Sequence, residues 1–117
     1  MNNQELQNYM KQHKSTLKIL FKAKTNQQKK NILLNLSLIE VNVIFHILFY
    51  ITQGVIPIKK HNYQILEKSK KLALLYRFFE NDLILEKNLA LPLKEKIGLL
   101  LKFVPVYETL FHPIFKR

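Results

Sequence analysis

The sequence contains no cysteine, two glycines and four prolines among its 117 residues. Without cysteine it has no disulfide framework, no thiolate chemistry and no cysteine-ligated metal site. The few glycines form no glycine-rich phosphate loop, and there is no nucleophile elbow and no H-E-x-x-H motif. These absences argue against an enzyme, a cofactor and a metal site, and the four histidines are too dispersed for a metal cluster: His13, His46, His61 and His112.

Long hydrophobic runs are also missing. The most apolar stretch, residues 38–51, is interrupted by Glu40, Asn42 and His46. It is shorter than the ~20 residues that a membrane span needs, so we expect a buried helix. Asn42 and His46 lie one helical turn apart and are interpreted as a polar pair rather than as ligands or catalytic groups. The polar N-terminus lacks the apolar core of a secretory signal.

Acidic residues are scarce, because eight Asp and Glu face nineteen Lys and Arg, for a net charge of +11. Such an excess attracts polyanions. Only Arg77 and Arg117 are arginines, and lysine is a point charge without the bidentate fork of arginine. The composition therefore favours contact with phosphates over reading of bases. An AT-rich genome would enrich lysine codons in the same way.

Helical periodicity and helix-start signals predict an all-α protein, a compact bundle with one very apolar central helix. Thr25 with Gln28, and Ser37 with Glu40, have the form of capping boxes, and Gly54 is a plausible helix stop. We expect about five helices, near residues 14–22, 25–36, 37–54, 59–79 and 93–103.

The fourth of these helices carries an apolar residue every seven positions, at Ile58, Ile65, Leu72 and Phe79. The acidic segment "ENDLILEKN" (residues 80–88) that follows is interpreted as a turn. The chain is then divided into a flexible polar arm (residues 1–13), a helical domain (residues 14–102) and an apolar, proline-containing tail (residues 103–117).

The basic residues concentrate in two blocks on either side of the apolar helix, because residues 31–58 contain neither Lys nor Arg. If both blocks fold onto one side, they form a single phosphate-binding surface. Ordinary solvated helix faces are the alternative interpretation. The candidate nucleic-acid-binding residues are Lys14, Lys18, Lys22, Lys29, Lys30, Lys60, Lys68 and Lys71.

The tail "FVPVYETLFHPIFKR" also has two interpretations. Pro105 and Pro113 would let it wrap back over the bundle and close the core. Alternatively, its aromatic residues and terminal Lys-Arg suit a membrane interface or a capsid protein. The candidate residues for such a contact are Phe103, Val106, Tyr107, Phe111 and Phe115.

The order of five short segments resembles a family of small basic proteins encoded by adintoviruses and Polinton (Maverick) elements. The segments are "FKAK" (21–24), "GVIPI" (54–58), "LEKSKKL" (66–72), "LKEKIGLLLK" (93–102) and "FVPVYETLFHPI" (103–114). The chain departs from the family in lacking its Gly-Gly pair before Phe103. The resemblance implies a virion protein, similar to the core proteins that neutralise packaged DNA in adenovirus-like particles.

Taken together, these observations predict a non-enzymatic virion or core protein, derived from a virus or a transposon, that binds DNA non-specifically through lysine-rich helices. If the protein is viral, we expect it in the virion and the host nucleus, and otherwise inside the cell. The alternatives are a membrane-active or capsid-docking protein and a helical domain that binds a host protein.

Overall fold

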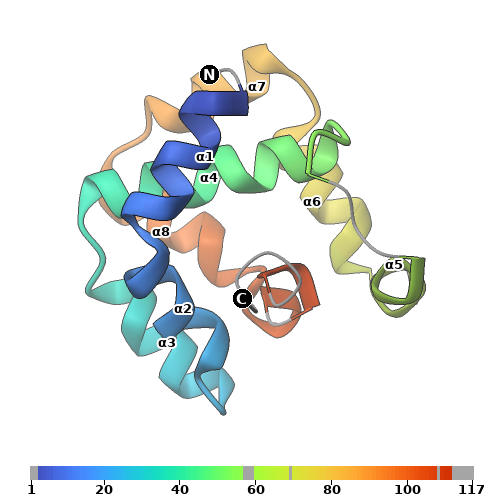
Figure 1. The fold of residues 1–117 in the computed structure, drawn as a ribbon, viewed down its shortest axis with the longest axis horizontal. Coiled ribbons are helices and arrows are strands. Elements are labelled where there is room, and N and C mark those ends of the chain that lie inside the picture. The colour runs from blue at the N-terminus through green and yellow to red at the C-terminus, as the bar shows by residue number, and fades with distance from the viewer. Residues whose placement is uncertain (1–2, 57–59, 69, 108, 112–117) are drawn as a thin grey trace.

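A central helix, α4 (Leu38–Thr52), organises the fold (Figure 1). The computed structural model describes residues 3–56, 60–68, 70–107 and 109–111. Helix α4 is apolar on nearly every face, so it must be surrounded to keep that surface from water. Four helices pack against it: α1 (Asn3–Gln12), α6 (Lys71–Phe79), α7 (Asp82–Leu89) and α8 (Leu93–Leu101). Its buried residues are Val41, Val43, Ile44, Phe45, Ile47, Leu48, Phe49 and Ile51.

The all-α prediction is confirmed, but the number of helices is not. The described residues form eight α-helices and one 3₁₀ helix, η1 (Val104–Val106), and no strand, where about five helices were expected. The Cα radius of gyration is 13.1 Å, close to the value of about 13 Å typical of one domain of this length.

Both predicted capping boxes are formed. The Thr25 hydroxyl accepts a hydrogen bond from the backbone N–H of Gln28 at 3.1 Å, at the start of helix α3 (Asn26–Leu34). The Ser37 hydroxyl accepts from the Glu40 amide at 3.2 Å and starts α4. Gly54 has a φ of +76°, the left-handed conformation that ends many helices. These local signals fixed the helix boundaries because they act within one turn of the chain.

The N-terminal segment was expected to be a flexible arm over residues 1–13, and the structure shows a helix from Asn3 to Gln12. Helix α1 packs against α4 and against α2 (Lys14–Lys22). Its Leu6 is buried, and Met10, one turn later, packs on the core. The polar composition concealed this pair, which places an otherwise hydrophilic helix against the core.

The predicted fourth helix is two helices, α5 (Lys60–Glu67) and α6. Leu72 and Phe79 are buried, but Ile65 is 48% exposed, so the seven-residue spacing does not mark one continuous face. Ile58 lies outside the described residues. The acidic segment that was expected to be a turn forms α7 instead, and the Asn81 side chain caps it by accepting a hydrogen bond from the Ile84 amide at 3.0 Å.

The C-terminal tail closes the core as far as residue 111. Phe103, Tyr107 and Phe111 are fully buried and Val106 is nearly so. These four side chains are therefore not available as a membrane or partner surface in this fold, and Phe115 lies outside the described residues. The Tyr107 hydroxyl donates a hydrogen bond to the Leu100 carbonyl, which ties the tail to the end of α8.

Candidate nucleic-acid interface

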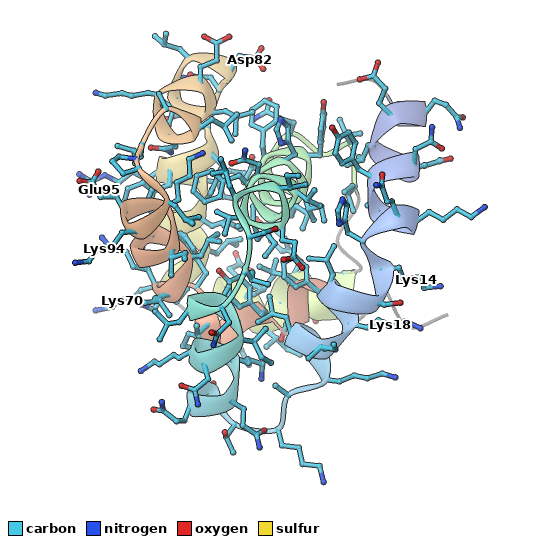
Figure 2. All side chains as sticks on the ribbon, turned by 90° about the vertical axis from the view of Figure 1, so that its left-hand side faces the viewer. Lys14, Lys18, Lys70, Asp82, Lys94 and Glu95 are labelled. Atoms are coloured by element: carbon cyan, nitrogen blue, oxygen red, sulfur yellow. The ribbon has the colours of Figure 1, made fainter. Side chains whose placement is uncertain are left out.

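The candidate interface begins with three lysines on successive turns of α2: Lys14, Lys18 and Lys22, called here the α2 lysine row. Their four-residue spacing places them on one face of the helix. The opposite side of α2 is anchored by Leu17 and Leu20, which are almost completely buried. Because those two residues fix the rotation of the helix, the lysine row faces outward. Figure 2 shows Lys14 and Lys18 pointing away from the body of the protein on the same side.

The charges of the lysine row act on one another. The pKa of Lys18 is lowered, first by its partial burial and then by the positive charges of Lys14 and Lys22. Between Glu5 and Glu40 the sequence holds seven lysines and no Asp or Glu. Helices α1 to α3 and their connections therefore concentrate positive charge, and an incoming anion relieves the repulsion within the lysine row.

Lys29 differs from the other predicted contacts. Its side chain is only 5% exposed, and its Nζ donates a hydrogen bond to the Ala23 carbonyl at 3.0 Å. That bond holds the link between α2 and α3, because Ala23 is the first residue after α2. Lys29 is therefore a structural lysine, whereas Lys30 is exposed.

A groove of about 670 Å³ lies beside the lysine row, between α2 and α3, and is called here the α2–α3 groove. Lys18 and Lys22 stand on its edge, and its apolar lining comes from Ile19, Ala23 and Ile32. Ile19 is 59% exposed. Sequence analysis overlooked this groove, although Ile19 stands between two lysines and off the buried stripe of Leu17 and Leu20.

The second basic block does not join the first. Lys60, Lys68 and Lys70 are exposed and Lys71 is half-buried. In Figure 1, α5 lies at the far right and α2 and α3 lie at the lower left. In Figure 2, Lys70 lies on the side opposite Lys14 and Lys18.

The expected single surface is therefore not formed. The physical reason is that the two blocks are attached to different parts of the bundle: α2 packs on α1 and α3, whereas α5 packs on α6, which packs on α4.

Asn42 and His46 are half-buried and belong to a polar cluster that includes the buried Lys96. The His46 Nδ1 is hydrogen-bonded to the Asn42 carbonyl at 2.8 Å, and the Lys96 Nζ donates to the Asn42 Oδ1 at 2.7 Å. Lys96 is 2% exposed and its Nζ lies 6.0 Å from the centre of the Phe45 ring. Burial lowers the pKa of Lys96. Sequence analysis missed this lysine because its partner is 54 residues away along the chain.

Metal ligation finds no support in the described part of the chain, where no three His, Asp or Glu side chains are grouped. None of the described helices has the length and hydropathy of a membrane span. No family model, no curated protein and no solved structure matches this chain. The resemblance to adintovirus and Polinton proteins therefore stays a prediction.

Proposed function

We propose that this chain is a non-enzymatic protein that binds the phosphate backbone of nucleic acid without reading its sequence. The observation that carries the proposal is the α2 lysine row, in a segment that has no carboxylate between Glu5 and Glu40. Following the resemblance, the setting would be the virion of a virus or of a virus-derived element, and the host nucleus, with the protein neutralising packaged DNA.

The dimensions of the lysine row suit this role. Lys14 and Lys22 are eight residues apart, which is about 12 Å along an α-helix at 1.5 Å per residue. Duplex DNA carries one negative charge per about 1.7 Å of its axis, so the row can face several phosphates at once. The row contains no arginine and no Asn or Gln that could form bidentate contacts with base edges. Contact is therefore expected with DNA of any sequence.

The test measures binding of labelled duplex DNA of random sequence by fluorescence anisotropy. In one variant, Lys14, Lys18 and Lys22 are all replaced by Gln. In a matched control, three exposed lysines of the opposite side, Lys60, Lys68 and Lys70, are replaced by Gln, so that both variants lose the same net charge. Both variants change only lysines that are exposed or half-buried, so both are expected to fold.

Each phosphate contact contributes about 0.9 to the slope of log affinity against log salt concentration. Loss of three contacts should lower that slope by about 2.7, so that between about 50 and 200 mM salt the wild type loses about 40-fold more affinity than the α2 variant. The control variant should keep a slope close to that of the wild type. Equal losses in the two variants would show that net charge alone drives binding, and a wild type that responds little to salt would refute the proposal.

A further inference from the structure

The apolar lining of the α2–α3 groove is not explained by phosphate binding. Phosphates contact charged and polar groups, whereas this groove offers Ile19, Ala23 and Ile32 beside Lys18 and Lys22. A ligand that satisfies both features has an apolar side chain next to negative charges. A helix is one such ligand, because packed helices place the side chains of one into the grooves of another.

Helix α7 has those features on the same molecule. Its Leu83 is 75% exposed, more than any other large apolar residue among the described ones. Glu86 lies three residues later on the same face of the helix, and Asp82 precedes it. Glu80, Asp82 and Glu86 are all exposed and outnumber the single exposed cation of α7, Lys87, so this end of a protein with a net charge of +11 carries a net negative charge.

The two surfaces cannot meet within one molecule. Helix α7 lies at the top of Figure 1, and α2 and α3 lie at the bottom. Figure 2 places Asp82 at the top on one side and Lys14 and Lys18 lower on the other. Contact between them requires two molecules, arranged head to tail.

We propose that a second copy of this chain occupies the α2–α3 groove with its helix α7. Leu83 of the second copy packs on Ile19, while its Asp82 and Glu86 lie against Lys18 and Lys22. A single exposed leucine would need no explanation. Here it stands beside Asp82 and Glu86, and a groove with an apolar lining and two lysines exists on the same chain. This contact does not depend on nucleic-acid binding.

A head-to-tail contact leaves one groove and one α7 unpaired at the ends, so it extends into a chain of copies unless a ring closes. It also uses Lys18 and Lys22, which belong to the lysine row. Self-association and phosphate binding at those two lysines therefore compete. Lys14, which does not line the groove, stays accessible to phosphate in the assembled form.

The test is sedimentation velocity of the full-length, nuclease-treated protein at rising concentration. About 0.15 M salt is suitable, because a Debye length of about 8 Å screens the long-range repulsion between cationic copies but not contacts between touching charges. The wild type should show a mass that increases with concentration. Ile19→Asp blocks the groove and Leu83→Asp blocks the inserting helix, and each should weaken association about tenfold or more, because the apolar contact between Leu83 and Ile19 is lost and a carboxylate must give up its water at the contact.

Mixing the two variants provides the decisive measurement. Ile19→Asp retains a normal α7 and Leu83→Asp retains a normal groove, so the mixture should form heterodimers with wild-type affinity and nothing larger. Ile65→Asp is the matched control, since Ile65 is an exposed isoleucine of α5, and it should associate as the wild type does. All three positions are exposed, so these variants are expected to fold.

Three results would overturn the proposal. A wild type that stays monomeric across the concentration range excludes the second copy as the occupant. Failure of the two variants to complement each other excludes the pairing of α7 with the groove. Binding of a monomeric wild type to phosphatidylserine vesicles, lost in Ile19→Asp but not in Ile65→Asp, would assign the groove to an anionic lipid instead.

Discussion

Replacement of Asn42 by leucine should destabilise the protein strongly, because Asn42 supports a buried positive charge. The Lys96 Nζ donates a 2.7 Å hydrogen bond to the Asn42 side chain and is otherwise placed near the face of Phe45. Hydrogen bonds to charged groups contribute about 1.5–3 kcal/mol. Without the Asn42 side chain, the buried ammonium group of Lys96 loses this hydrogen bond. We expect the free energy of unfolding of Asn42→Leu to fall by about 2–3 kcal/mol at neutral pH.

Replacement of Lys96 by methionine should have a much smaller effect. The hydrogen bond is lost here as well, but the cost of burying a charge disappears with it, and methionine fills a similar volume. Lys96→Met should therefore lie within about 1 kcal/mol of the wild type, and the double variant Asn42→Leu/Lys96→Met should be at least as stable as the wild type. The double-mutant cycle should then show an interaction energy of about 2 kcal/mol between the two positions.

The pH dependence of stability gives an independent readout. Burial lowers the pKa of Lys96 in the folded protein below the ordinary value of 10.5. Between those two pKa values the unfolded chain binds more protons than the folded one, so the contribution of Lys96 to stability increases as the pH rises toward 10.5. Lys96→Met should lack this increase. The comparison must be made between variants, because the buried Tyr107, whose pKa is raised, contributes a loss of stability as the pH rises above 10.

Urea denaturation of the four proteins, followed by circular dichroism at several pH values, measures these quantities. The reasoning is refuted if Lys96→Met is destabilised as much as Asn42→Leu, or if the effects of the two changes are additive. Either result would mean that Lys96 is held at the surface rather than within the core.

Three further predictions concern the core and the helix ends. Phe103→Ala should lower the free energy of unfolding by about 3–5 kcal/mol, because removal of a fully buried ring that contacts Phe79 leaves a cavity. A change below about 1 kcal/mol in urea denaturation would contradict the packing of the tail. Ser37→Ala should cost about 1 kcal/mol by removing the cap of α4, with Ser37→Asn, another good cap, as the control. Tyr107→Phe should cost about 1 kcal/mol at neutral pH, because the hydrogen bond to the Leu100 carbonyl is lost. It should also reduce the loss of stability above pH 10, which urea denaturation at neutral pH and above pH 10 would measure.

Particular residues show why sequence analysis succeeded for parts of this protein. Thr25, Ser37 and Gly54 act within one turn of the backbone, so their meaning could be interpreted without knowledge of the rest of the fold. The largely apolar character of residues 38–51 likewise predicted a buried helix wherever the other helices lay. The break between α5 and α6 could not be found in this way, because the seven-residue spacing of apolar residues continues across it.

The candidate site was predicted only in part. The α2 lysine row follows from spacing alone, whereas the burial of Lys29 depends on the Ala23 carbonyl at the end of the preceding helix. The separation of Lys70 from Lys14 and Lys18, seen in Figure 2, depends on tertiary packing, because α2 packs on α1 and α3 whereas α6 packs on α4.

The sequence by itself determined the all-helical architecture, the apolar central helix and the row of lysines on α2. Each of these follows from periodicity or charge along a few consecutive turns, which the chain carries with it into any fold. The tertiary structure alone decided that the two basic blocks face opposite sides, that Lys96 is buried on Asn42, and that the tail is part of the core. Those outcomes depend on contacts between residues far apart in the chain, and a helix that is apolar on nearly every face does not specify which neighbour packs on which face.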